Sequence, residues 1–335
     1  MAQVKPKAEG QILDVRNLRI EAVTETGMRV TLVDDVSFTL NAGEVLGLIG
    51  ESGAGKSTIG LSTMVYARTG CQITGGQILF HGRDLRELNI KGRQNLRGAK
   101  VAYIAQSAAA AFNPAHTIFD QVAEVALQHG VMNRAQARMD AIRLFRELEL
   151  PSPDTFGNRY PHQVSGGQLQ RAMAAMAMIA RPDLLVFDEP TTALDVTTQV
   201  EVLASFKKLI REHRTAALYI SHDLAVVAQI ADRILVLRGG KMVEQGEATQ
   251  ILQRPQMDYT RMLVAERVAA EQSRFVEGHV EGDRPLLEVK NVVAAYRGTA
   301  RVIDDVSIDV RRGDTLAIVG ESGSGKSTLA RVIVG

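Results

Sequence analysis

The chain of 335 residues carries the pattern of a phosphate-binding loop twice. GESGAGKST occupies residues 50–58, and GESGSGKST occupies residues 320–328. The pattern GxxxxGK[ST] fixes two glycines, a lysine and a hydroxyl residue, so average residue usage predicts a chance match in about one or two chains of this length per hundred. Two nearly identical copies constrain the fold to one that places a glycine-rich turn between a strand and a helix.

Each residue type in this loop suits a nucleotide phosphate. Glycines let the backbone turn tightly and aim N–H groups at phosphate oxygens, at the positive end of the next helix. Lys56 would reach the outer phosphates, and the Ser57 hydroxyl is a hard oxygen ligand suited to Mg²⁺. An apolar run before the loop and helical spacing after it favour this interpretation over a chance glycine-rich turn. The predicted nucleotide-binding residues are Gly50, Glu51, Ser52, Gly53, Ala54, Gly55, Lys56, Ser57 and Thr58, and in the second copy Gly320, Gly323, Gly325, Lys326, Ser327 and Thr328.

Composition narrows the class of protein. With 39 basic and 38 acidic residues the formal net charge is +1, which argues against a dedicated nucleic-acid binder. The single cysteine, Cys71, cannot form an internal disulfide, which favours a reducing compartment such as the cytosol. No run of eighteen uncharged apolar residues is present, so we expect no membrane span, and the apolar stretch 172–180 is expected to be a buried helix.

An internal repeat predicts the domain organisation. LDVRNL at Leu13 corresponds to LEVKNV at Leu287, and DDVSFTL at Asp34 corresponds to DDVSIDV at Asp304. We therefore expect a first domain over 1–266, a charged linker over 267–285 and the truncated start of a second copy over 286–335. Strands of that last piece, such as TLAIV at 315–319, would present unpaired edges, and we expect the piece to pack loosely on the first domain or not at all.

Further motifs downstream of the first loop carry chemistry. DLLVFDEP at 183–190 is an apolar strand that ends in Asp188 and Glu189. Beside a phosphate loop such carboxylates hold Mg²⁺ and polarise the attacking water, although alone they would indicate only an acidic turn. HQVSGGQLQRA at 162–172 places a hydroxyl and free backbone N–H groups at a helix start, which is a second anion site. His222 follows the apolar strand ALYIS, where site residues gather.

The order of these motifs resembles that of the ATP-binding-cassette (ABC) ATPases over residues 11–265. The resemblance rests on GESGAGKST, Gln106 after VAYIA, VSGGQ, LLVFDEP, ALD at 193–195 and ISHD. It implies an α/β P-loop NTPase cassette with an antiparallel β layer, a parallel-rich core sheet and a helical insert at about 107–161. It also implies ATP and Mg²⁺ as ligands and ATP hydrolysis as the activity.

The resemblance assigns roles to single residues. Lys56, Ser57 and Asp188 would bind phosphate and metal, Glu189 would act on water, Gln106 would sense the metal and the transport subunit, and His222 would bond the terminal phosphate. Two cassettes pack head to tail in this family. The residues that would meet the partner's nucleotide or cross the dimer contact are Ser165, Gly166, Gly167, Gln168 and Asp195.

AAFNPAHTI at Ala110, RYPHQVSGGQLQR and RPQMDYTRMLVAE at Arg254 are similar to the peptide and nickel importer ATPases. This similarity implies a peripheral protein at the cytoplasmic face of the bacterial inner membrane, which powers import of peptides or a similar small solute. The implied partners are permease subunits, a second cassette and, indirectly, an external solute-binding protein. The alternatives are a non-transport tandem cassette that acts on ribosomes or DNA, and a nonfunctional remnant.

The sequence departs from the family pattern in two places. Ala22 stands where an aromatic residue would stack on adenine, whereas the second copy has Tyr296 there. Loss of such stacking would remove about 1 to 3 kcal/mol if values from nucleic-acid stacking transfer. Ser107 and Ala108 replace the acidic residue and the proline that commonly follow the glutamine, in a segment that faces the transport subunit in the family.

Overall fold

The computed structural model describes residues 10–192, 194–272, 285–296, 301–320 and 323–335, with the backbone alone over 266–272. By its internal contacts the chain divides into two compact units, residues 1–193 with 200–271, and residues 194–199 with 272–335. The predicted linker 267–285 coincides in part with the end of helix α11 (Asp258–Gln272). Several predicted features lie in part outside the described residues: the first nine residues of the first domain, Ala193 of the ALD motif, linker residues 273–284, and residues 297–300 and 321–322 of the second copy, the last two within its phosphate loop.

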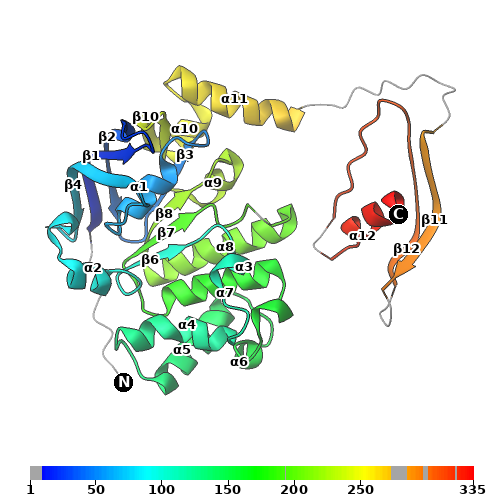
Figure 1. Ribbon diagram of the computed structural model, residues 1–335, viewed down its shortest axis with the longest axis horizontal. Helices are drawn as coiled ribbons and strands as arrows, with labels where there is room; N and C mark the ends of the chain where they lie inside the picture. Colours follow the sequence, from blue (N-terminus) through cyan, green and yellow to red (C-terminus); the bar gives the residue numbers. More distant parts are fainter. Residues whose placement is uncertain (1–9, 193, 273–284, 297–300, 321–322) are drawn as a thin grey trace. The chain divides into compact units, whose positions relative to one another are not determined.

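The first unit begins with an antiparallel sheet in the strand order β2-β1-β4-β5 (Figure 1). Buried and exposed residues alternate over parts of β1 and β2, because one face of the sheet packs on the core and the other meets solvent. This sheet is the predicted antiparallel layer. Its strands are β1 (Gln11–Val23), β2 (Arg29–Asn41), β4 (Cys71–Phe80) and β5 (Arg83–Asp84).

The second sheet of this unit has the order β10-β9-β3-β8-β7-β6 and is parallel except for β10 at one edge. Every residue of β3, β7 and β8 is buried, which agrees with their continuous apolar sequences. The predicted parallel-rich core sheet is thus confirmed. Its strands are β3 (Val45–Gly50), β6 (Val101–Ile104), β7 (Leu184–Asp188), β8 (Ala216–Ile220), β9 (Arg233–Arg238) and β10 (Lys241–Glu247).

One hydrophobic cluster joins the two sheets. Leu13 and Phe38 from the antiparallel sheet meet Leu48 and Leu218 from the parallel sheet, and Ile59 of helix α1 (Lys56–Ser62) completes the contact. Helix α1 packs against β7 and β8 and also reaches β2. The phosphate loop that precedes α1 is therefore supported from both sheets.

Helices α3 to α6 form the predicted insert, and α7 packs on three of them (Figure 1). Thr117 caps α4, and Asn133 with Gln136 forms a capping box on α5, which explains where both helices begin. The predicted buried helix is α7, whose residues 172–175 are all buried. The helices of the insert are α3 (Ala108–Ala111), α4 (Ile118–Gln128), α5 (Arg134–Glu147), α6 (Pro153–Phe156) and η2 (Pro161–Gln163). The other helices of the unit are α1 (Lys56–Ser62), η1 (Leu85–Glu87), α2 (Ile90–Leu96), α7 (Gly166–Met178), α8 (Val196–His213), α9 (Leu224–Ile230), α10 (Ala248–Gln253) and α11.

The described residues of the second unit from 285 onward form a hairpin and one helix: β11 (Leu287–Ala295), β12 (Arg301–Val310) and α12 (Lys326–Val334). The predicted strand TLAIV is wrong, because residues 315–319 have no regular structure. In the first unit the equivalent strand β3 pairs with β8 and β9, whereas the described part of the second unit offers no such neighbours. Without partners its N–H and C=O groups cannot form a ladder.

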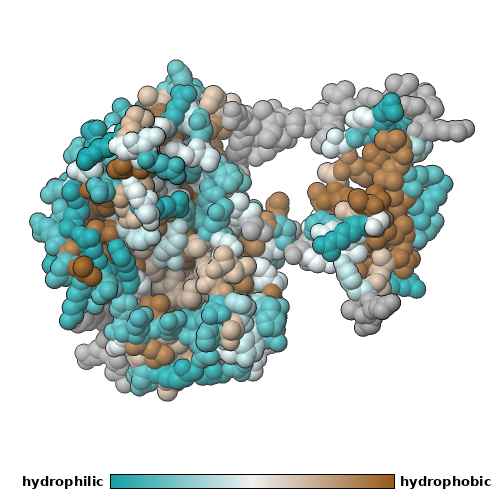
Figure 2. Space-filling model, in the orientation of Figure 1, coloured by the Kyte–Doolittle hydropathy of each residue, from teal (hydrophilic) through white to brown (hydrophobic). Residues whose placement is uncertain are grey.

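The second unit exposes much of its apolar surface. Figure 2 shows hydrophobic residues gathered over one face of it, and Leu316, Val319 and Val334 are 47%, 87% and 89% exposed. Leu316 and Val319 line a hollow of about 550 Å³ next to β12 and α12. Within the described residues of either unit, no helix has both the length and the apolar character needed to cross a bilayer.

Candidate nucleotide-binding site

The predicted phosphate loop connects the end of β3 to the start of α1, as the sequence indicates. Gly50 adopts φ 150°, and a Cβ atom there would lie 2.1 Å from the carbonyl oxygen of Leu237 on β9. Gly55 precedes α1 with φ 92° in the left-handed region. Only glycine satisfies both positions, so the loop geometry depends on the residue type that the motif specifies.

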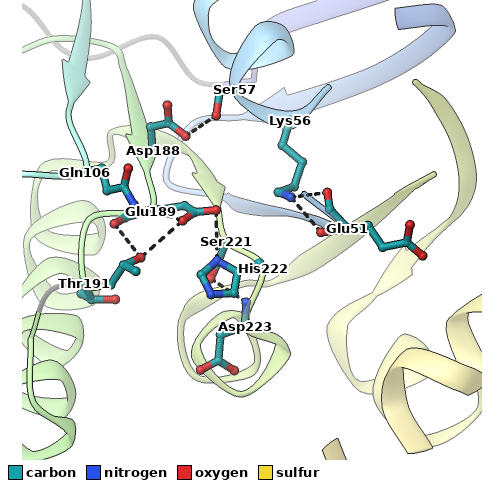
Figure 3. Close-up of polar contacts among 12 residues, drawn as sticks. Glu51, Lys56, Ser57, Gln106, Asp188, Glu189, Thr191, Ser221, His222 and Asp223 are labelled. Carbon is teal, nitrogen blue, oxygen red and sulfur yellow. Dashed lines mark hydrogen bonds and ion pairs between the residues drawn. The ribbon is translucent and has the colours of Figure 1, made fainter. Parts of the chain in front are cut away.

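Lys56 lies within the curve of the loop. Its side chain is 6% exposed, and Nζ donates hydrogen bonds to the carbonyl oxygens of Gly50 and Glu51 at 2.7 and 2.8 Å (Figure 3). Burial lowers the pKa of Lys56, and the carboxylates of Glu189 and Asp188 oppose that shift. The loop thus holds a cation among carbonyl oxygens and close to two acidic groups.

Asp188 is buried at the carboxyl end of β7 and uses both carboxylate oxygens. The Ser57 hydroxyl donates to Oδ1 at 2.7 Å, and the Tyr103 hydroxyl donates to Oδ2 at 2.6 Å. A hydroxyl and a carboxylate side by side are the hard oxygen ligands that Mg²⁺ prefers. The described residues contain no group of three or more His, Cys, Asp or Glu side chains placed to hold a metal. The pair fits an ion that would take most of its ligands from water and phosphate.

Glu189 stands at the centre of a second set of contacts (Figure 3). Its carboxylate lies 3.1 Å from His222 Nδ1, accepts from Thr192 Oγ1 at 3.4 Å, and lies 3.5 Å from Gln106 Nε2, at the limit of a hydrogen bond. These partners come from segments that follow β8, β7 and β6. The carboxyl ends of adjacent parallel strands meet at one sheet edge, so the fold brings the motif residues together.

Two contacts in this site were not predicted. Tyr103 lies in the apolar strand β6, where the surrounding sequence is typical of a buried core strand. Thr192 follows Asp188 and Glu189 in the chain and belongs to none of the predicted motifs. The Thr192 contact is local, since this residue lies three positions after Glu189. The order of strands in the sheet decides the Tyr103 contact, since β6 pairs with β7 and Tyr103 lies opposite Val186. No local pattern contains that order.

Ser165 and Gln168 cap α7 and bond to each other. Ser165 Oγ accepts from the backbone N–H of Gln168 at 3.3 Å, and Gln168 Oε1 accepts from the N–H of Ser165 at 3.2 Å. Gly166 and Gly167 form the first turn, so the predicted helix start is confirmed. None of the hydrogen bonds found among the described residues joins Ser165 to the phosphate loop of its own chain. Asp195 accepts from the N–H and hydroxyl of Thr198 at the start of α8.

The second copy repeats part of the first site within its own unit. Lys326 Nζ donates to the Gly320 carbonyl at 2.7 Å, and Gly325 precedes α12 with φ 95°. The hydroxyl of Tyr296 lies 3.2 Å from that of Thr328, a contact that lowers the pKa of the phenol. The predicted aromatic residue therefore contacts the end of its phosphate loop.

The two hairpins share a register. Leu13 pairs with Leu40 and Val15 with Phe38, while Leu287 pairs with Val310 and Val289 with Ile308. Ala22 and Tyr296 each follow their first leucine by nine positions (22 − 13 and 296 − 287). The alanine is thus the counterpart of the tyrosine, and it pairs with Val30 and Cys71 inside the sheet.

Comparison with known families agrees with this geometry. Residues 33–192 and 303–335 match the family model described as "ABC transporter". Both phosphate loops and the strand that ends in Asp188 lie within the matched residues.

Curated relatives match nearly the whole chain. The glutathione import ATP-binding protein GsiA of Escherichia coli K12 is 37% identical over 97% of this chain and 58% of its own length. The protein of the same name from Shigella boydii is 36% identical over the same shares. The chain spans a little over half the length of the relatives it matches.

Solved structures share the fold. A bacterial ABC transporter cassette, MJ0796, solved as a dimer, aligns with a TM-score of 0.62 at 24% identity over 71% of this chain and 99% of its own. CbiO1 from Clostridium perfringens aligns with a TM-score of 0.64 at 20% identity, over 79% of this chain and 96% of its own. The predicted fold class, a P-loop NTPase cassette with an antiparallel layer, is confirmed.

Proposed function

The chain belongs to the ABC transporter family, and from this premise we propose that it binds ATP with Mg²⁺ and hydrolyses the ATP to ADP and phosphate. The observation that carries the proposal is the convergence of Lys56, Ser57 and Asp188 with Glu189 and His222 at one edge of the parallel sheet. The first group suits phosphate and metal, and the second suits an attacking water. These are the parts that phosphoryl transfer to water requires.

Each residue has a separate task in this proposal. The loop N–H groups from Gly50 to Thr58 and the Lys56 ammonium bind phosphate oxygens. Ser57, Asp188 and Gln106 would hold Mg²⁺ directly or through water, and Mg²⁺ would supply positive charge against the phosphates. The remaining nucleotide-binding residues of the loop are Glu51, Ser52, Gly53, Ala54 and Gly55.

Glu189 orients the attacking water, and His222 contacts the terminal phosphate. Because His222 Nδ1 faces Glu189 at 3.1 Å, the ring can donate to both Glu189 and a phosphate oxygen only as the protonated imidazolium. A cation at this place would also stabilise the charge that develops on the transferred group.

We further propose that a second cassette completes the site. Ser165 to Gln168 present a hydroxyl and backbone N–H groups at the start of the 13-residue helix α7, a ready anion site without hydrogen bonds to its own loop in the described structure. Against the nucleotide of a partner cassette it would close a cage over the terminal phosphate. Asp195 would meet the partner at the same contact.

The transported solute and the other partners follow from the named relatives. They are called glutathione import proteins, and glutathione is a tripeptide, so we infer a role in importing peptides or a comparable small solute. The chain would then act at the cytoplasmic face of a bacterial inner membrane, with permease subunits and, indirectly, an external binding protein. The nearly equal numbers of basic and acidic residues argue against a nucleic-acid partner.

We propose the domain boundaries of the repeat as well. Residues 1–266 form one cassette with its insert at about 107–161, residues 267–285 form the linker, and residues 286–335 begin a second cassette. A nucleotide bound to this second cassette would contact Tyr296, Gly320, Gly323, Gly325, Lys326, Ser327 and Thr328.

Matched lysine variants test the proposal. Lys56→Ala should remove Mg²⁺-dependent ATP hydrolysis and weaken binding of a fluorescent ATP analogue, since the buried ammonium is lost. Lys326→Ala should retain turnover, because Asp188 and Glu189 make their contacts with Ser57, Gln106 and His222 of the first site. Phosphate release and fluorescence titration measure both effects. Equal loss in the two variants, or none in Lys56→Ala, would exclude the first loop as the working site.

A further inference from the structure

Tyr103 holds a position that no motif assigns. It lies on β6 at the edge of the parallel sheet, opposite Val186 of β7, two residues before Asp188. Its hydroxyl nevertheless reaches the Asp188 carboxylate at 2.6 Å. This separation is typical of a charge-assisted O–H···O⁻ hydrogen bond, which is about twice as strong as a neutral one.

The two oxygens of Asp188 are divided between two donors. Oδ1 accepts a hydrogen bond from Ser57, which belongs to the phosphate loop. Oδ2 accepts a hydrogen bond from Tyr103, which belongs to the sheet. Asp188 is 6% exposed, so few waters can replace either donor. The Tyr103 bond therefore fixes the rotation of the carboxylate and leaves Oδ1 as the oxygen that faces Ser57.

Tyr103 is suited to remain a donor. Burial raises the pKa of its phenol, and the hydrogen bond to Asp188 and the negative charge of that carboxylate raise it further, while Arg68 opposes the shift. Its ring also packs against the hydrophobic cluster between the sheets, which fixes the hydroxyl in place.

We propose that Tyr103 is a positioning residue for the divalent cation: its hydroxyl orients Asp188 so that Oδ1 and Ser57 Oγ share the place where Mg²⁺ binds with the nucleotide. The inference rests on the proposed Mg-nucleotide site. Residues of this kind, which contact a ligand of the metal and not the metal, typically change metal affinity by about 10- to 100-fold.

Tyr103→Phe separates this role from simple packing, because it removes the hydroxyl and keeps the ring. Affinity for a fluorescent ADP analogue would be measured on the full chain, first in EDTA and then across a Mg²⁺ titration. In EDTA we expect the variant to bind as the wild type does, which also shows that its loop is folded. The Mg²⁺ midpoint should rise about 10-fold or more.

Two controls distinguish failure of this inference from failure of the proposed function. Tyr66→Phe removes a hydroxyl from a tyrosine that is 45% exposed, and it should leave the midpoint unchanged. Asp188→Asn should abolish the dependence of ADP-analogue affinity on Mg²⁺. A wild type whose affinity for the analogue does not depend on Mg²⁺ would overturn the proposed metal site itself. A Mg²⁺-dependent wild type with an unchanged midpoint in Tyr103→Phe would overturn the role of Tyr103 alone.

Discussion

At the residue scale, Glu189 shows how the fold sets up a reactive side chain. Its φ of 49° lies in the left-handed region, which costs a residue with a side chain about 1 to 2 kcal/mol. Its N–H donates to the Ile220 carbonyl at 3.0 Å, a bond to the neighbouring strand that holds this conformation. The turn directs the carboxylate toward His222 and Gln106, so strain coincides with the proposed chemistry.

Glu189→Gln should retain nucleotide binding and lose turnover. The amide keeps the shape of the side chain but cannot accept a proton from water, and general-base assistance is typically worth about 10² to 10⁴ in rate. Phosphate release at saturating ATP, beside an ATP-binding titration, measures the two properties separately.

A matched control exists on the helical insert. Glu149 has a similar φ of 55° and is exposed, so Glu149→Gln should leave turnover within twofold of the wild type. Undiminished hydrolysis in Glu189→Gln would remove Glu189 from its proposed role.

At the element scale, the two copies of the phosphate loop separate what a local sequence can determine from what it cannot. Gly55 and Gly325 adopt nearly the same φ, and α1 and α12 begin at equivalent lysines, because these features depend on local residue types. The preceding apolar run forms β3 in one unit and no strand in the other. A strand needs partners that lie far away in sequence, so residue spacing predicted the loops and the motif residues, but not the strand order or the contact of Tyr103.

Glu244 on β10 provides an element-scale prediction. Its carboxylate is buried and accepts from the N–H groups of Gln256 and Met257 and from the Gln250 amide, which fixes the turn between α10 and α11. Burial acts to raise the pKa of Glu244, but the hydrogen bonds from Gln256, Met257 and Gln250 outweigh it and the pKa is lowered overall. Glu244→Gln should reduce the free energy of unfolding by about 1 to 3 kcal/mol at pH 7.

The sign of the pH effect follows from that lowered pKa. At pH values above its unfolded pKa of about 4.5, the ionised carboxylate stabilises the folded state. This stabilisation is lost as the pH falls through the lower pKa of the folded state. The difference in the free energy of unfolding between the wild type and Glu244→Gln, measured by urea unfolding, should therefore shrink below about pH 4.5. Glu247→Gln, at the exposed end of the same strand, should show little difference at any pH. A constant difference between pH 7 and pH 3 would contradict this account.

At the scale of the whole molecule, the two units differ in how completely they bury apolar surface. The first has two sheets with a shared core and a helical insert, while the second exposes residues such as Val319 and Val334. The first unit also holds the residues proposed for both halves of a composite site, Lys56 for its own nucleotide and Ser165 for that of a partner. Two copies paired head to tail would thus contain two complete sites.

The most direct measurement is phosphate release by a mixture of two variants, each lacking one half of that site. Lys56→Ala cannot bind its own nucleotide, and Ser165→Arg blocks the anion site at the start of α7. Each should be nearly inactive alone. An equimolar mixture should recover about a quarter of wild-type turnover, because half of randomly formed pairs are mixed and each holds one complete site. Wild-type turnover should also rise faster than linearly with protein concentration. A mixture without activity beside an active wild type whose turnover is linear in protein concentration would contradict a hydrolytic site shared between cassettes.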